Sequence, residues 1–429
     1  MSNFLFSTMP EPGHVNPAIP VAIELVRRGH RVLWHTGPAF RRTVESTGAE
    51  FVAFDRTPDL AQIPVEADPG TSGIAEGVSI MRRLFIDRVP GQVADYRRIL
   101  ESFPADAVVA DMTSLGAATL RDLGGPPFAT LGINPLTTLD PEIPPFGSGR
   151  PVATSASGRL RNRASHWMAR RFFMPRLTTL LDAQRAMLGL GPVSAEFADL
   201  MQSPYLHIMP TTPAFEYPRR NLAPQVHFVG PLLPASPAHP EPPVWWSELD
   251  GRRVVHVTQG TYATDAGSLI RPTIDALAGD DVLVIATTRD AGSLGQVPPN
   301  VRVAPFVPHV LLLPKVDAMV TNAGYNGVLT ALAHGVPLVC AGQTEDKAEV
   351  SARVAWSGAG IDLRTSTPTR DEVRSAVDRV LREPAFRRNA RRIEADFARH
   401  DGPREAADLL ETLASTGAPV LREGSAGRA

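Results

Sequence analysis

Residues 4–36, FLFSTMPEPGHVNPAIPVAIELVRRGHRVLWHT, contain two short apolar runs separated by an amphipathic segment. Within that segment Asn16 suits a helix N-cap, Pro17 the first helical position and Gly29 the C-terminal cap. Apolar residues recur at helical spacing between these ends, which indicates a helix with one face packed on a sheet. The stretch therefore predicts a β-α-β unit whose two strands are adjacent and parallel.

The same alternation of strand and helix patterns returns in both halves of the chain. It predicts an α/β protein with two doubly wound parallel sheets, one in each half. The further strand patterns lie at residues 105–111, 127–133, 252–263, 280–288, 301–307, 316–324 and 336–342.

A chain of 429 residues is too long for one typical core, so we expect two domains. Six prolines within residues 231–243 favour an extended linker. We therefore expect an N-terminal domain at 1–228 and a C-terminal domain at 229–402. A helix follows at 403–418, for which packing back on the N-terminal domain is one arrangement, and residues 419–429 form a tail.

Composition excludes several classes of protein. Apolar residues make up 43%, charged residues 21%, and the net charge is −2, which gives no overall drive toward nucleic acid or an anionic membrane. The single cysteine, Cys340, excludes an internal disulfide and a cysteine-based zinc site. The chain shows no basic leader and no apolar run near the ~20 residues that a membrane-spanning helix needs, so we expect a cytoplasmic protein.

The segment VDAMVTNAGYNGVLTALAHGVP, residues 316–337, predicts a strand, a turn of small residues and a helix. Backbone N–H groups at the start of that helix carry partial positive charge, so a diphosphate fits above Gly327 without a metal. Asn322 and Asn326 can add side-chain donors. Taken alone, such a turn is more often only a turn.

Four stretches together resemble the nucleotide-sugar glycosyltransferases of the UDP-glycosyltransferase superfamily, in the branch that acts on bacterial natural products or macrolides. They are GHVNPAIPVAIELVRRGHRV at 13–32, VVADMTSLGAATLRDLG at 108–124, VVHVTQGT at 254–261 and the block at 300–360. The resemblance covers nearly the whole chain. It implies the GT-B fold, in which two Rossmann-like domains face a central cleft, with the acceptor in the N-terminal domain and the donor in the C-terminal domain.

The resemblance also assigns donor-binding positions. The base is expected at an aromatic residue and its neighbours, the diphosphate at the glycine-rich helix start, and the donor sugar at an acidic residue and the residue after it. In that order the positions are Phe306, Val307 and His309; Asn322, Gly324, Tyr325, Asn326 and Gly327; and Asp346 and Lys347; with Thr258, Gly260 and Thr261 on the facing loop.

Four positions depart from the family pattern. The family often has His at Asn322, Ser at Gly327, Glu at Thr330 and Gln at Lys347. Thr330 is a shorter, uncharged substitute for a bidentate acceptor. Phosphate and ribose recognition are therefore expected to differ in detail, and the identity of the sugar stays open.

His14 and Asp111 are the candidate catalytic pair. Both follow strands of the N-terminal half, and ligands gather at the carboxyl ends of parallel strands. A neutral imidazole can accept the proton of an attacking hydroxyl, and a carboxylate can orient it, as the matching family positions do. In the alternative, His14 is an ordinary loop residue and Asp111 caps the helix that begins near Thr113.

No D-x-D motif occurs in the chain, so a metal-bridged diphosphate has no obvious ligands. We expect neither a metal nor another cofactor, and an activity that survives a chelator.

Residues 143–181 contain seven arginines and no acidic residue. By position in the family architecture this segment borders the acceptor site, where Trp167, Phe172 and Phe173 are candidates for contact with a hydrophobic molecule. Packing into the core is equally compatible with the pattern, and contact with an anionic membrane is the third alternative.

The sequence thus predicts an inverting, metal-independent O-glycosyltransferase that moves a sugar from a UDP- or dTDP-sugar to a hydrophobic small molecule. The alternatives are a sugar-nucleotide epimerase or isomerase on the same fold, and a non-catalytic binding or helper protein. A monomer or homodimer is expected, with no nucleic acid partner and no membrane insertion.

Overall fold

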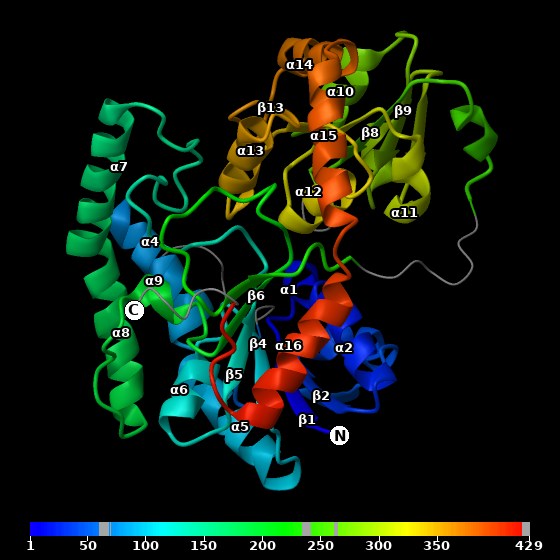
Figure 1. Ribbon diagram of the computed structural model, residues 1–429. Coiled ribbons are helices and arrows are strands. Elements are labelled where there is room, and N and C mark those ends of the chain that lie inside the picture. The colour runs from blue at the N-terminus through cyan, green and yellow to red at the C-terminus, as the bar shows by residue number, and fades with distance from the viewer. Residues whose placement is uncertain (60–67, 69, 234–241, 261–264, 423–429) are drawn as a thin grey trace.

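The computed structural model describes residues 1–59, 68, 70–233, 242–260 and 265–422. They form two α/β domains stacked one above the other, with the N-terminal domain in blue to green and the C-terminal domain in yellow to orange (Figure 1). Each domain contains one parallel sheet, as the sequence predicts.

The N-terminal sheet has seven strands in the order β3-β2-β1-β4-β5-β6-β7, all parallel. Phe4 of β1 pairs with Val32 on one side and Ala107 on the other, so both strands of the predicted β-α-β unit lie inside the sheet and not at its edges. The strands are β1 (Asn3–Ser7), β2 (Arg31–Thr36), β3 (Glu50–Ala53), β4 (Ala107–Asp111), β5 (Phe128–Leu131), β6 (Leu206–Met209) and β7 (Val226–Phe228).

The helices of this domain include a long outer pair, α7 and α8, joined by a π-helical turn at Ala169–Phe173. The helices are α1 (Pro12–Val15), α2 (Ala18–Arg27), α3 (Arg41–Glu45), α4 (Ile74–Met81), α5 (Val89–Ser102), α6 (Gly116–Asp122), α7 (Ala156–Met168), α8 (Met174–Met187) and α9 (Phe197–Leu200).

The C-terminal sheet has six parallel strands in the order β10-β9-β8-β11-β12-β13. Its strands are β8 (Val254–Thr258), β9 (Leu283–Thr287), β10 (Val301–Ala304), β11 (Ala318–Thr321), β12 (Leu338–Cys340) and β13 (Gly360–Asp362). Its helices are α10 (Ile270–Leu277), α11 (His309–Leu312), α12 (Tyr325–Leu332), α13 (Lys347–Trp356), α14 (Arg370–Arg382) and α15 (Pro384–Phe397).

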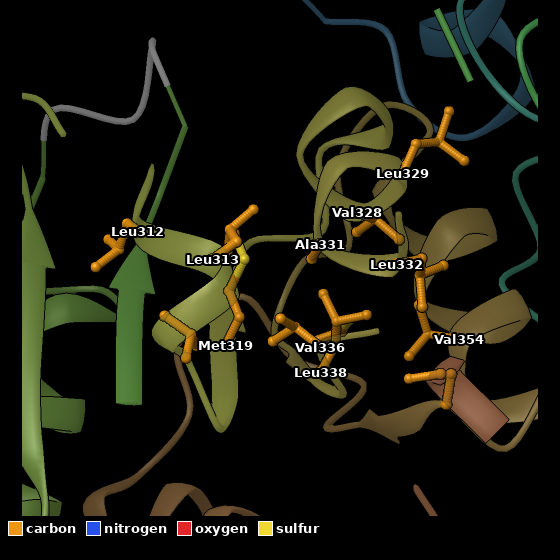
Figure 2. Close-up of a cluster of buried hydrophobic side chains, with 14 of the residues drawn as sticks. Leu312, Leu313, Met319, Val328, Leu329, Ala331, Leu332, Val336, Leu338 and Val354 are labelled. Atoms are coloured by element: carbon orange, nitrogen blue, oxygen red, sulfur yellow. The ribbon is translucent and has the colours of Figure 1, made fainter. Parts of the chain in front are cut away.

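Helix α12 is anchored on this sheet by its apolar face. Val328 and Leu332 are buried in one cluster with Met319 of β11, Leu338 of β12 and Val354 of α13 (Figure 2). Each fully buried aliphatic side chain contributes about 1.5–3 kcal/mol. The cluster therefore fixes the position of the helix start that was predicted to bind phosphate.

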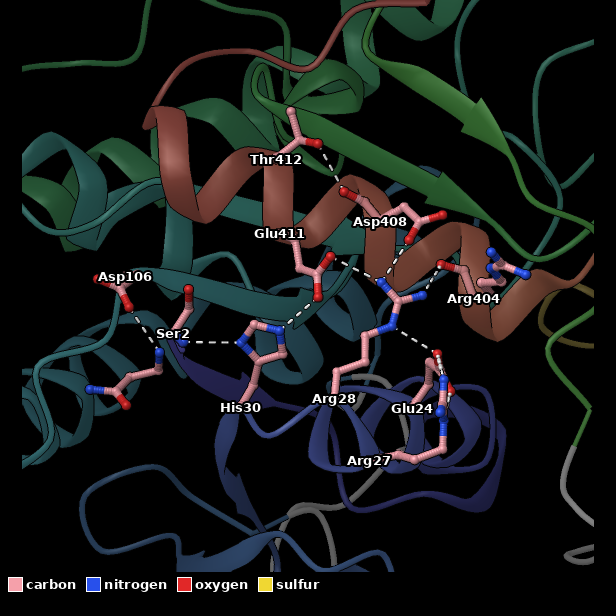
Figure 3. Close-up of polar contacts among 11 residues, drawn as sticks. Ser2, Glu24, Arg27, Arg28, His30, Asp106, Arg404, Asp408, Glu411 and Thr412 are labelled. Carbon is pink, nitrogen blue, oxygen red and sulfur yellow. Dashed lines mark hydrogen bonds and ion pairs between the residues drawn. The ribbon is translucent and has the colours of Figure 1, made fainter.

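The last helix, α16 (Gly402–Thr416), packs on the N-terminal domain although it follows the C-terminal domain in the chain. Ala406, Leu410 and Leu413 are buried in the same cluster as Phe4 of β1. Arg28 at the end of α2 binds Asp408 at 2.6 Å and Glu411 at 3.0 Å (Figure 3). The linker predicted at 231–243 falls between β7 and β8, and its residues 234–241 lie outside the described residues.

The start of the first helix differs from the expectation. Instead of a loop up to Asn16, the structure has a one-turn helix, α1, with Pro12 at its first position, and Asn16 caps its C-terminal end. Pro17 is the N-cap of α2 rather than its first residue. His14 therefore lies on a helical turn, which fixes its direction more firmly than a loop would.

None of the helices within the described ranges combines the length and the apolar content needed to cross a bilayer.

Replacing Leu410 by Ala should destabilise the N-terminal domain by about 2–5 kcal/mol, because the fully buried leucine leaves a cavity between α16 and the sheet. Amide hydrogen exchange measures this, and the amides of β4 and β5 should exchange faster while those of β8 and β11 do not. Ser415→Ala, an exposed position on the same helix, is the control. Faster exchange only in the C-terminal domain would contradict this packing.

Candidate functional site

His14 and Asp111 meet at the carboxyl edge of the N-terminal sheet. β1 and β4 are adjacent and parallel, so the segments that follow them leave the sheet on the same side. His14 Nδ1 lies 3.2 Å from Asp111 Oδ2, at ion-pair distance. The ring N–H does not point straight at the oxygen, so a small rotation of the imidazole is needed to complete a hydrogen bond.

Asp111 is the fixed member of this pair. It is 1% exposed and accepts hydrogen bonds from the backbone N–H of Met9 at 2.6 Å and of Thr113 at 2.8 Å. Burial by itself raises the pKa of Asp111, but the charge of His14 and the hydrogen bonds from the Thr113 hydroxyl and the Met9 N–H outweigh it and bring the pKa to about 2. Asp111 thus holds the turn at Thr113 and faces His14. The alternative that it caps a helix is wrong, because α6 begins at Gly116 and has no side-chain cap.

The second ring nitrogen of His14 faces outward. The side chain is 15% exposed, and no other described residue makes a hydrogen bond to Nε2. When Nδ1 carries the proton toward Asp111, Nε2 holds a lone pair. This atom is therefore available to accept a proton from a ligand.

The N-terminal end of α12 touches the segment that carries His14. The Asn326 side chain donates to the carbonyl oxygen of Gly13 at 3.2 Å, which joins the two domains next to His14. Gly324 is the extended N-cap of α12, and no side chain caps the free N–H groups of the first turn. Figure 1 shows α12 at the edge of the C-terminal domain directly above α1. The structure thus brings the predicted diphosphate position and His14 together.

Two residues support the turn before α12. The Asn322 amide donates one hydrogen to the carbonyl oxygen of Gln259, after β8. Gly342, after β12, lies so close to Asn322 that a Cβ there would be 2.1 Å from the Asn322 carbonyl oxygen. Asn322 therefore connects the segments that follow β8 and β11. Its second amide hydrogen is left for a ligand.

Two non-glycine residues adopt left-handed backbone conformations beside this site. Ala323 has φ 63° and Glu345, just before Asp346, has φ 57°. Such conformations cost about 1–3 kcal/mol each and concentrate at functional sites. Both strained residues lie on the predicted donor loops.

The remaining positions on α12 behave differently from one another. A Cβ at Gly327 would meet nothing within 4 Å, so the face above it is open. Tyr325 points the other way and is buried in the core, which leaves only its backbone for a ligand. Thr330 donates its hydroxyl hydrogen to the carbonyl oxygen of Asn326 at 2.6 Å, so it can only accept from a ribose.

Asp346 and Lys347 begin α13. Burial raises the pKa of Asp346 to about 6, although the charge of Lys347 acts against this. The charge of His14 also acts on this pKa, so the two side chains are within electrostatic reach across the domains. Lys347 Nζ contacts Glu345 and Thr344, while no side chain of the described residues donates to the Asp346 carboxylate. That carboxylate is thus open to hydroxyl donors.

The predicted base-binding residues divide into one exposed and two packed side chains. Phe306 is 70% exposed on the loop after β10, as a stacking surface must be. Val307 is buried in the core, so it can offer only backbone groups. His309 packs edge-on against His256 with ring centroids 5.4 Å apart, and burial lowers its pKa.

The loop after β8 is described only in part. Thr258 is the buried last residue of β8. Gly260 follows with φ 73°, and a Cβ on it would face the side-chain amide of Asn322. Thr261 lies outside the described residues.

The candidate acceptor residues are on the outer helices. Trp167 is 61% exposed and Phe172 is 43% exposed, and they contact each other edge-on. Phe173 instead packs against the cluster below α8. The structure therefore places the side chains of Trp167 and Phe172 at the protein surface.

The sequence reasoning missed the residues that hold the donor loops in place, which are Gln259, Gly342, Glu349 and Arg353. The spacing Glu349-x-x-x-Arg353 on a helix is a recognisable ion-pair signal. Its partners on the N-terminal domain are distant in sequence and give no local signal.

The fold is that of a two-domain α/β protein with opposed parallel sheets, and comparison with known proteins defines the family. Residues 271–413 match the C-terminal domain of erythromycin biosynthesis protein CIII-like proteins. The chain is 46% identical to 4'-demethylrebeccamycin synthase of Lentzea aerocolonigenes, over 95% of this chain and 99% of the relative. It is 28% identical to demethyllactenocin mycarosyltransferase of Streptomyces fradiae, over 97% and 88% of the two chains.

Among solved structures, the calicheamicin glycosyltransferase CalG4 superposes with a TM-score of 0.74 at 23% identity, over 98% of this chain and 100% of that chain. The chain therefore belongs to the natural-product branch of the UDP-glycosyltransferase superfamily, with the GT-B fold. It is a glycosyltransferase that uses a nucleotide sugar.

Affinity for a nucleotide sugar should fall as the pH drops below about 6, because the Asp346 carboxylate, whose pKa burial raises to about 6, becomes protonated and loses acceptor capacity. Isothermal calorimetry between pH 5 and 8 measures this for a UDP-sugar and a dTDP-sugar. The Asp346→Asn variant should bind the nucleotide sugar weakly at every pH between 5 and 8. A wild-type profile unchanged in that variant would contradict the assignment.

Proposed function

We propose that the protein is an inverting, metal-independent glycosyltransferase in which His14 is the general base and Asp111 orients it. The proximity of His14 to the first turn of α12, made by the hydrogen bond from Asn326 to Gly13, supports this most directly. The isomerase and helper alternatives do not agree with the family, whose relatives named above are transferases.

In the proposed reaction the acceptor bears a hydrogen on its attacking atom. That proton passes to Nε2 of His14 as the attacking atom bonds to the anomeric carbon of the donor. The buried carboxylate of Asp111 stabilises the imidazolium that forms. The bond from the anomeric carbon to the diphosphate oxygen breaks at the same time, and displacement from the opposite face inverts the configuration.

The C-terminal domain would stabilise the leaving group. Negative charge grows on the diphosphate as it departs, and the N–H groups of Asn326 and Gly327, which no side chain caps, would donate to it. About half a positive charge at a helix N-terminus, together with the Asn326 amide, favours this anion. The Asp346 carboxylate accepts hydroxyl hydrogens of the sugar.

The substrates follow from the same site and from the relatives. Phe306 offers an exposed ring for a nucleoside base, and a related structure, the glycosyltransferase VinC, is a complex with dTDP. The names of other relatives specify UDP. We propose a UDP- or dTDP-sugar as donor and a hydrophobic small molecule as acceptor. The sequence favours a hydroxyl acceptor, and an N–H group would meet the same base.

Replacing His14 by Ala should lower kcat by ~10²–10⁴-fold, because the attacking atom loses its proton acceptor. Release of nucleoside diphosphate and formation of the glycoside are measured with an acceptor panel containing hydroxyl and N–H compounds. Binding of UDP and dTDP should stay unchanged, since those contacts lie on the other domain. Near-normal turnover in His14→Ala would exclude the role.

Metal independence makes a separate prediction. Activity should persist in excess EDTA, because backbone donors and an amide carry the charge stabilisation at α12. Loss of activity with EDTA that Mg²⁺ restores would contradict the proposal.

A further inference from the structure

A buried cluster of four charges joins the two domains beside the donor-sugar position. Glu216 and Arg219 come from the loop after β6, and Glu349 and Arg353 come from α13. Their side chains are between 1% and 3% exposed. The cluster contains two positive and two negative charges, so each buried charge has an opposite charge to offset the cost of desolvation.

Arg353 is the link across the domains. Its Nη2 lies 2.8 Å from Glu216 Oε1 and its Nε donates to the same oxygen at 2.9 Å, while Nη1 reaches Glu349 at 3.2 Å. The guanidinium also stacks 4.1 Å above the ring of Tyr217. The planar guanidinium of Arg353 thus contacts Glu216 and Glu349 through its edges and Tyr217 through one face.

A second contact ties the same helix to the N-terminal domain. Glu349 accepts the backbone N–H of Gly149 at 2.8 Å. Gly149 has φ 58°, and a Cβ there would lie 2.9 Å from the Ala348 side chain, so only glycine allows this approach. Gly149 belongs to the long connection between β5 and α7, within the arginine-rich segment 143–181. The acceptor domain therefore contacts α13 within its first turn.

Each half of the cluster is paired by itself. Arg219 binds Glu216 at 3.1 Å within the N-terminal domain, and Arg353 binds Glu349 within α13. Glu216 further accepts the backbone N–H groups of Leu136 at 3.0 Å and Tyr217 at 2.7 Å. Loss of Arg353 therefore leaves Glu216 paired with Arg219 and removes the ion pair between the domains. It also takes the cation from Glu349, which keeps the N–H of Gly149 as its donor among the described residues.

We propose that Arg353 is a positioning residue for sugar transfer. Through Glu216 it holds the start of α13, with Asp346 and Lys347, at the separation from His14 that the reaction needs. This inference rests on the proposed function, because it assumes that Asp346 holds the donor sugar and that His14 is the base. A displacement of about 1 Å at the reacting centre can cost ~10²-fold in rate.

Arg353→Met tests this, since methionine keeps an unbranched apolar stem over Tyr217 and removes the charge. We expect kcat to fall by ~10²-fold while the affinities for UDP and dTDP, measured by calorimetry, stay within about twofold. Arg353→Lys should recover only part of kcat, because a single ammonium cannot bind both carboxylates as a fork. Arg374→Met is the control for loss of an arginine ion pair within one domain, as it breaks the 3.0 Å pair with the partly exposed Asp280.

Small-angle X-ray scattering gives a readout independent of activity. Arg353→Met should broaden the distribution of interdomain distances, whereas Arg374→Met should match the wild type. Wild-type kcat in Arg353→Met, or a loss of nucleotide affinity as large as the loss of kcat, would overturn the proposal. If the wild type itself transfers no sugar, the proposed function fails, and an unchanged scattering curve for Arg353→Met would then overturn the positioning role separately.

Discussion

The structure depends on one constraint, that the carboxyl edges of two parallel sheets face each other across the domain boundary. The hydrogen bond from Asn326 to the carbonyl oxygen of Gly13 is the point where those edges touch near His14. A parallel sheet collects its ligand-binding loops at one edge, so two opposed sheets place two sets of loops around one space. The chemistry of the site then follows from which side chains each edge presents.

The pKa values of the two carboxylates of the site, Asp111 and Asp346, are shifted in opposite directions. Backbone donors and His14 hold the pKa of Asp111 near 2, which keeps it charged beside the imidazole. Burial without comparable donors raises the pKa of Asp346 to about 6. Different environments thus give one carboxylate a permanent charge and the other a charge that a sugar hydroxyl can stabilise. The ion pairs around Arg353 hold these two environments at a constant separation.

Much of the fold was predictable because strand and helix periods are local. The β-α-β unit at residues 4–36 and five of the six strands of the C-terminal sheet, β8 to β12, appear where apolar patterns placed them, whereas β13 was not predicted. The approach of His14 to Asp111 was also predictable, since strand ends of one sheet share an edge. The one-turn helix α1 was not predicted, because a loop with two prolines and a helical turn have the same apolar pattern.

Side-chain direction at the donor loops could not be predicted. Tyr325 and Val307 point into the core, and Asn322 donates to the carbonyl oxygen of Gln259 at a neighbouring strand end. Ala323, just before α12, has a left-handed backbone that the apolar pattern does not indicate. The Glu216–Arg353 contact joins residues 137 positions apart, so no periodic pattern in the sequence indicates it. Such features depend on tertiary packing, which a local pattern does not encode.

A crystal structure with a bound nucleotide-sugar analogue tests the central claim most directly. The account predicts diphosphate oxygens at the backbone N–H groups of Asn326 and Gly327, with the anomeric carbon roughly 6 Å from His14 Nε2, room for one attacking atom between them. A diphosphate bound away from the start of α12, or a sugar separated from His14 by packed side chains, would contradict it.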